Sequence, residues 1–296
     1  MKGIFLFVLL MAASSASAEP RIVGVGKVAI HVPTPAGFSE LTHAMKPLWV
    51  VNRAGVPASS EQLIAFIPEE SVPAALTGSV PAVTRHFRLQ VGKDGRDLEI
   101  SRSMFVELKK ITRESWEKIP HGLKNDIRAI EKQYSEALSE IGAAQNDVSL
   151  EAPVTLAPHY ETSDSYHFSI ISRLAFDQDG RPASKVGTGT AVLILAKGRI
   201  LYAYVYGGEK DLEWTRAQAK QWTEAILAAN MDTEVTAPTT APIAAPTGIL
   251  DKIMRKTTAA AFGGAIVGIV TVILGLVFAG LGRLLRYMRR QKDSTD

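Results

Sequence analysis

Residues 187–207 read GTGTAVLILAKGRILYAYVYG, and this stretch decides how the chain folds. Two apolar runs flank the pair Lys197-Gly198, and a dipeptide of this kind between two such runs is typical of a tight β-hairpin turn. The predicted pairs on one face are Ile194–Leu201, Val192–Ala203 and Thr190–Val205, and those on the other are Leu193–Tyr202, Ala191–Tyr204 and Gly189–Tyr206. Both faces are largely apolar, so we expect the hairpin to be interior and covered on both sides.

The segments around this hairpin extend it into a meander followed by a helix. Alternating residues predict strands over 154–159 and 166–176, and a glycine-containing turn at 179–180 leads back to the hairpin. Residues 211–230 follow at helical spacing, with Asp211 as the expected N-cap. The apolar face of this helix is predicted to pack on the sheet, through Leu212, Ala219, Trp222, Ile226 and Leu227.

The N-terminal half is less regular. It predicts strands over 27–32, 63–68 and 86–91, and a short helix over 101–110. Residues 114–141 contain the strongest amphipathic pattern, which favours a long helix. Strands, then helices, then strands and a closing helix indicate an α+β fold, with a mainly antiparallel sheet covered by helices in an α/β/α sandwich over residues 19–230.

This element order resembles that of the PsbP-like family. The resemblance rests on the early strand and proline turn at 28–37, the central helical stretch, the strand at 198–206 and the closing helix at 222–230. It covers roughly residues 24–230 and includes a longer helical insertion than is usual. Because members of that family are mostly accessory and binding proteins, the resemblance implies a binding protein here and assigns no functional residue.

The two ends of the chain predict export and membrane attachment. Residues 1–18 have the basic start, short apolar run and small residues of a cleaved signal peptide. Residues 231–248, with a proline every fourth position from Pro238, are typical of an extended linker. Residues 257–282 contain no charged residue and no proline, which predicts one transmembrane helix in addition to the α/β/α domain.

The predicted orientation follows mainly from the signal peptide, which sends the N-terminal part across the membrane, and the basic tail at 283–296 favours the same orientation. The tail has five basic and two acidic residues, so its net charge is +3, which equals the net charge of the whole chain. We therefore expect a cytoplasmic tail, a bacterial inner-membrane helix and a periplasmic N-terminal domain. Since the exported domain is then near neutral, its composition does not favour nucleic acid as a partner.

Small residues form one face of the predicted transmembrane helix. This face starts with a Gly-x-x-x-Gly motif, in which small side chains let two helix backbones approach closely. The residues concerned are Gly264, Gly268, Thr271, Gly275 and Ala279. Lipid, and either a second copy of the chain or another membrane protein, are the partners that this pattern predicts.

Sequence motifs for catalysis or cofactor binding are not found. The chain has no cysteine, which excludes disulfides, thiolate metal sites and a cysteine nucleophile. No phosphate-binding loop, zinc-protease motif or nucleophile elbow is present, so no cofactor, metal or enzyme activity is predicted. A turn at 163–164 predicts that Tyr160 pairs with His167 and His159 with Phe168, which directs the two imidazoles to opposite faces.

One aromatic group leaves two interpretations open. Tyr202, Tyr204 and Tyr206 share a strand face, either as a platform for a ligand or as packing within the core. The predicted function is a non-catalytic binding or scaffolding domain held at the membrane. The alternatives are a ligand-sensing module coupled to pairing of the transmembrane helix, or a hydrolase with an unrecognised site.

Overall fold

The central hairpin forms as its turn chemistry requires. In the computed structural model, which describes residues 19–114, 124–141, 148–151, 153–178 and 181–231, β9 (Arg181–Ala196) pairs antiparallel with β10 (Arg199–Gly208). Lys197 and Gly198 have φ angles of 47° and 70°, which suits a two-residue turn with both φ values positive. All six predicted cross-strand pairs are present, so the predicted register is confirmed.

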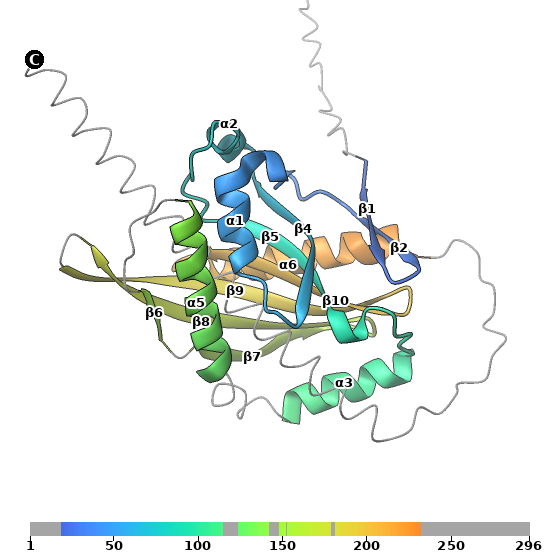
Figure 1. The fold of residues 1–296 in the computed structure, drawn as a ribbon. Helices are drawn as coiled ribbons and strands as arrows, with labels where there is room; N and C mark the ends of the chain where they lie inside the picture. Colours follow the sequence, from blue (N-terminus) through green and yellow to red (C-terminus); the bar gives the residue numbers. More distant parts are fainter. Residues whose placement is uncertain (1–18, 115–123, 142–147, 152, 179–180, 232–296) are drawn as a thin grey trace, which may run out of the picture.

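An eight-stranded antiparallel sheet grows on both sides of this hairpin (Figure 1). Its order is β3-β4-β5-β10-β9-β8-β6, and β7 also pairs with β8. The predicted α+β architecture with a mainly antiparallel sheet is therefore confirmed for the described residues. The remaining strands are β1 (Arg21–Val25), β2 (Val28–Val32), β3 (Phe38–Glu40), β4 (Ser60–Pro68), β5 (His86–Gly92), β6 (Val148–Leu150), β7 (Val154–Glu161) and β8 (Ser165–Gln178).

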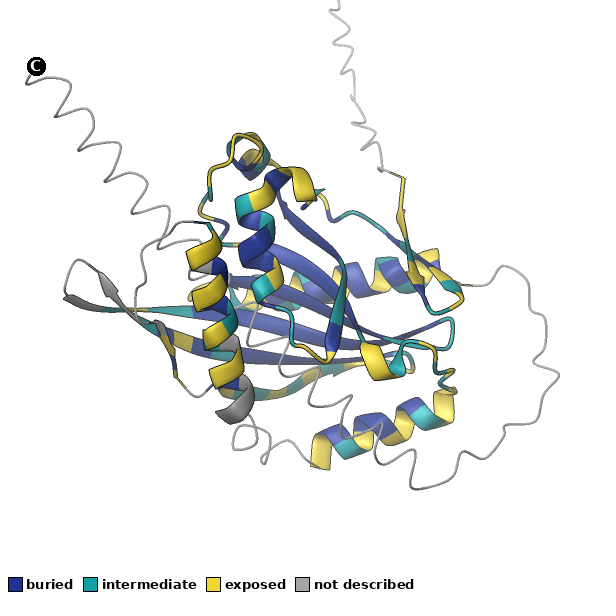
Figure 2. Cartoon of the chain, viewed as in Figure 1, coloured by how far each residue is buried: buried dark blue, intermediate teal, exposed yellow. Residues whose placement is uncertain are grey.

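Helices lie on both faces of the sheet (Figure 1). The longest of them, α6, lies behind the sheet in this view, while α1 and α5 lie in front of it. The helices are α1 (Lys46–Ala54), α2 (Val72–Leu76), α3 (Arg102–Glu114), α5 (Lys124–Glu140) and α6 (Leu212–Ala229), and the short 3-10 turns are His43–Met45, Glu69–Ser71 and Lys93–Gly95. Figure 2 shows that the central strands are buried while the helices expose their outer sides.

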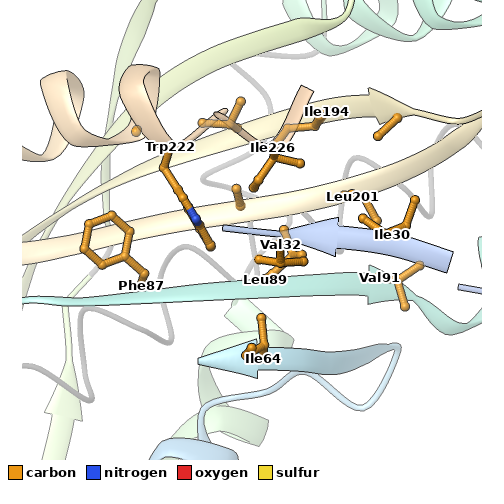
Figure 3. Close-up of a cluster of buried hydrophobic side chains, with 14 of the residues drawn as sticks. Ile30, Val32, Ile64, Phe87, Leu89, Val91, Ile194, Leu201, Trp222 and Ile226 are labelled. Atoms are coloured by element: carbon orange, nitrogen blue, oxygen red, sulfur yellow. The ribbon is translucent and has the colours of Figure 1, made fainter. Parts of the chain in front are cut away.

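The face of the sheet that contacts α6 is apolar. Trp222 and Ile226 of α6 meet Phe87 and Leu89 of β5, and the β1–β2 hairpin closes the same cluster through Ile30 (Figure 3). The indole of Trp222 packs edge-on to Phe87, with ring centroids 5.3 Å apart. Its Nε1–H donates to the Pro33 carbonyl at 2.9 Å, which fixes the N-terminal hairpin to the last helix.

The opposite face is covered by α1, α5 and α3. Leu48 of α1 packs on Ala65 and Ile67 of β4 in a smaller apolar cluster. By contrast, α3 is held at the turn between β7 and β8 by polar contacts as well as by its buried Phe105 and Leu108. These contacts are Arg102–Asp164 at 3.0 Å, Lys109 Nζ to the Thr162 carbonyl at 2.7 Å and Arg113–Glu161 at 2.6 Å.

The predicted transmembrane helix requires a correction. Among the helices of the described residues, none has the length and apolar character needed to cross a membrane, so the single-pass transmembrane part of the fold prediction is not upheld. The segment on which that prediction rested, 257–282, lies outside the described residues. The predicted signal peptide at 1–18, residues 232–248 of the predicted linker and the predicted tail at 283–296 also lie outside them.

Asn230 holds the end of α6 against β2. Its amide donates to the carbonyls of His31 and Ile226 at 2.7 and 2.8 Å, and its Oδ1 accepts from the His31 N–H at 2.9 Å. We expect Asn230→Ala to lower the free energy of unfolding by about 1–3 kcal/mol, because buried backbone groups lose their partners. Urea unfolding measures this loss. Gln221→Ala, at an exposed position on the same helix, should change it by less than about 0.5 kcal/mol.

Candidate functional site

The three tyrosines of β10 lie in the interior. Tyr202, Tyr204 and Tyr206 are 2%, 0% and 0% exposed, and they lie directly opposite Gln90, Arg88 and His86 of β5. An exposed ligand platform requires accessible ring faces, which these tyrosines do not present. We call the six side chains, on the sheet face opposite α6, the polar row.

Arg88 is the centre of the polar row and is fully buried. Its guanidinium donates to the backbone carbonyls of Gly55 and Asn52 at 2.8 and 2.9 Å, at the C-terminal end of α1. It also lies over the ring of Tyr206, 5.6 Å from the centroid. A helix C-terminus has unpaired carbonyls and a partial negative charge, so it stabilises a cation at this position. Arg88 thereby fixes α1 to the middle of the sheet.

Two neighbours of Arg88 in the row have polar atoms without protein partners. Among the described residues, no hydrogen-bond partner is present for either ring nitrogen of His86 or for either amide atom of Gln90. These side chains are 1% and 0% exposed. A buried polar group without a partner lowers the stability of the fold by about 1–3 kcal/mol. These side chains therefore destabilise the protein unless another molecule forms hydrogen bonds with them.

Burial keeps His86, Tyr204 and Tyr206 of the row neutral. Burial first, and the charge of Arg88 second, hold the pKa of His86 well below its ordinary value of 6.5. Burial likewise raises the pKa of Tyr204 and Tyr206 above their ordinary value of 10.0. At neutral pH the imidazole of His86 therefore has one donor and one acceptor nitrogen.

The two histidines of the β7–β8 hairpin come closer than the sequence predicted. Tyr160 pairs with His167 as expected, but a register shift between Leu156 and Tyr160 interrupts the ladder. His159 and His167 consequently have ring centroids 6.2 Å apart, so the prediction that they face opposite sides is wrong. Within the described part of the chain, no group of three or more metal-ligating side chains includes this pair.

His167 should make stability depend on pH. Burial, together with His159 and Lys220, lowers the pKa of His167 from its ordinary 6.5 to about 3. Between these values the unfolded chain binds a proton that the folded protein does not, so stability falls as the pH falls. We therefore expect the free energy of unfolding to decrease as the pH falls from about 6 to about 4. His167→Gln should reduce the slope of this pH dependence by up to about 1.4 kcal/mol per pH unit.

The control for this pH effect is a substitution at a position without a titratable side chain. Gln221→Ala, at an exposed position on α6, should leave the slope as it is in the unmodified protein. A slope that His167→Gln does not reduce would contradict the assignment to this imidazole.

An open cleft of about 620 Å³ lies where β3, β4, β10 and the start of α6 meet. Phe38 and Trp214 provide its aromatic surface, with ring centroids 6.3 Å apart, and both rings pack against the buried Phe87. The lining residues are Gly37, Phe38, Pro68, Glu70, Thr84, Arg85, Gly208, Glu209, Lys210, Asp211 and Trp214. We call this the Trp214 cleft.

A charged pair is held across the Trp214 cleft. Arg85 donates to Asp211 at 2.7 Å and lies over the Trp214 ring, 4.5 Å from its centroid. Asp211 occupies the N-cap position of α6 as predicted, but its carboxylate makes no capping hydrogen bond and instead accepts from Arg85 and from the Gly208 N–H at 2.9 Å. Arg85 first, and then the Gly208 N–H, lower the pKa of Asp211, which keeps it ionised.

A smaller groove of about 360 Å³ separates α1 from α5. Trp49 and Arg53 of α1 line one side, with the guanidinium 4.9 Å from the Trp49 ring centroid. Glu136 and Glu140 of α5 line the other side. Unlike the Trp214 cleft, this groove has a single aromatic ring and no ion pair across it among the described residues that line it.

Several predicted site residues are not among those that the structure describes. The small residues of the predicted helix-packing face, Gly264, Gly268, Thr271, Gly275 and Ala279, lie outside the described residues. Sequence reasoning also missed the Trp214 cleft, because Phe38 and Trp214 meet only through the fold. A signal for Arg88 did exist: residues 86–91 alternate polar and apolar, and the polar positions fall opposite the tyrosines.

Comparison with known proteins leaves this architecture without an assigned relative. No protein-family model, curated protein or solved structure matches the chain.

Proposed function

We propose that this chain is an exported, non-catalytic domain that binds a protein partner through the Trp214 cleft. The observation that carries the proposal is an open cavity of about 620 Å³ with two aromatic rings and a fixed ion pair in its wall. Trp and Arg are enriched among residues that dominate binding energy in protein interfaces. The proposed export rests on the sequence of residues 1–18.

Preorganisation favours binding at this cleft. The Trp214 ring is held between Arg85 and Phe87, so little side-chain freedom is lost when a partner docks. An apolar side chain of the partner would fill the space beside Phe38, while its polar groups meet the rim at Glu70 and Lys210. The PsbP-like element order agrees with such an accessory role and supports the same class of function.

Site-specific photo-crosslinking in native cells tests this proposal. A crosslinking amino acid at Lys210, on the rim of the cleft, should give a discrete adduct with another protein, whereas one at Lys132 on α5 should not. Thr84→Arg, which fills the cleft without removing an aromatic ring, should abolish the adduct. Gln221→Arg, on the exposed side of α6, should leave it intact.

Two results would contradict the proposed function. The first is an absence of any adduct at Lys210 beyond the background seen at Lys132. The second is an adduct that Thr84→Arg does not weaken. Circular dichroism of Thr84→Arg should match the unmodified protein, which shows that a lost adduct reflects a blocked cleft.

A further inference from the structure

The polar row contains more buried hydrogen-bonding atoms than the described residues satisfy. His86 and Gln90 contribute two such atoms each, and Asn52 of α1 contributes its Oδ1. Asn52 is 2% exposed, and its backbone carbonyl accepts from Arg88, so it lies on the same side of the sheet as the row. Since buried polar atoms in folded proteins almost always have partners, these five atoms call for an additional molecule.

The arrangement on β5 places these atoms on both sides of Arg88. Alternate residues of a strand face the same side, so His86 and Gln90 flank Arg88 under the helical layer. The His86 ring packs on Tyr206, with centroids 4.4 Å apart and the ring planes tilted by 30°, and cannot turn towards another group without losing that contact. The two ends of the row are about 13 Å apart, given about 3.3 Å per residue along a strand, so they hold separate molecules.

The chemistry of the unsatisfied atoms selects the kind of molecule. Asn52 Oδ1 and Gln90 Oε1 accept hydrogen bonds, and the neutral His86 ring has one acceptor nitrogen. An inorganic anion without hydrogens cannot donate to these acceptors. A metal ion or organic cation cannot accept from the Gln90 amide. A neutral hydroxyl, which both donates and accepts, meets all of these requirements.

We propose that the polar row binds neutral hydroxyl-bearing molecules, either water or a small alcohol, at His86 and at Gln90 between β5 and the layer of α1 and α5. This interior site is separate from the Trp214 cleft, so the two proposals can fail independently. On this proposal, the bound molecules and Arg88 together hold α1 against the sheet. Buried water of this kind is part of a structure and is costly to remove.

Gln90→Met tests the proposal. The melting temperature should change in opposite directions depending on whether a hydroxyl is bound at Gln90 or the Gln90 amide is unsatisfied. Methionine has a similar volume and no amide. If a hydroxyl is bound at Gln90, the variant removes its hydrogen-bond partner, and the melting temperature of the full chain should fall by about 2–6 °C. If the amide is unsatisfied, removing it should raise the melting temperature by a similar amount, which would overturn the proposal.

A matched control and a direct measurement complete the test. Thr223→Val removes another buried hydroxyl without a partner in the described residues, on α6 and outside the row, and should not lower the melting temperature. Water–protein cross-relaxation should connect bound hydroxyl protons to the Gln90 side-chain amide and vanish in Gln90→Met. This measurement applies to the unmodified protein, so it decides the question even if Gln90→Met does not fold.

Native mass spectrometry of the purified full chain distinguishes the two sources of the hydroxyl. A retained small alcohol adds a fixed mass that is lost on denaturation, whereas water leaves no such adduct and exchanges with D2O in the cross-relaxation experiment. A protein with neither an adduct nor cross-relaxation to Gln90 would contradict the proposal.

Discussion

Arg88→Met is expected to lower the free energy of unfolding by about 3 kcal/mol. The substitution removes both donors to the Asn52 and Gly55 carbonyls, and these acceptors stay buried at the end of α1. Hydrogen bonds to a charged group contribute about 1.5–3 kcal/mol each, and relief of the buried charge offsets part of that loss. Urea unfolding followed by circular dichroism measures the difference.

Arg88→Lys separates the charge from the geometry. A lysine keeps the cation but lacks the planar fork that reaches two carbonyls together, so we expect an intermediate loss of about 1–2 kcal/mol. Hydrogen exchange should show weaker protection of the α1 amides in both variants, and more so in Arg88→Met. Unchanged exchange in α1, or wild-type stability of Arg88→Met, would show that the helix does not depend on this guanidinium.

Trp222→Ala is expected to lower the free energy of unfolding by about 3–5 kcal/mol. The indole is buried between Phe66 and Phe87, and its loss leaves a cavity that a rigid sheet and helix cannot close. The variant also leaves the Pro33 carbonyl without its donor. The denaturant midpoint should fall while the slope of the transition stays the same, because the folded state keeps its overall shape.

Two further variants divide the Trp222 effect into its parts. Trp222→Phe keeps most of the apolar volume and removes the indole N–H, so its cost should be about 1–2 kcal/mol. Trp49→Ala removes an equally large ring that is only half buried on α1, and should cost less than Trp222→Ala. If the two alanine variants were equally destabilising, burial in the α6 cluster would not be the cause.

Local sequence determined the central part of the fold. The pair Lys197-Gly198 fixed the turn, and the alternation of side chains on either side then fixed which residues face each other. Because the side-chain period of a strand is two, the correct turn leaves one register that buries both apolar faces. The helical spacing of Ala219, Trp222 and Ile226 likewise predicted the face of α6 that contacts the sheet.

Elements with weaker local patterns were not predicted. Residues 46–54 form α1, a helix that was not predicted from the sequence. Nine residues give little periodicity, and the helix is stabilised by packing of Leu48 on β4 and by Arg88 at its end. The bulge in β7 was missed for a similar reason, since an extra residue leaves no mark on a short strand.

Residues close together in the chain suffice to predict seven of the strands, the register of the central hairpin and the apolar face of the last helix, whereas β1, β3 and β6 were not predicted. Tertiary structure alone decided the two cavities, the pairing of Asp211 with Arg85 and the burial of the polar row. Each of these joins residues from distant segments, and alternation within one strand cannot show whether a face meets solvent or a second layer of helices. The tyrosines of β10 are the clearest case, because Gln90, Arg88 and His86 of β5 come to lie opposite them only in the folded chain.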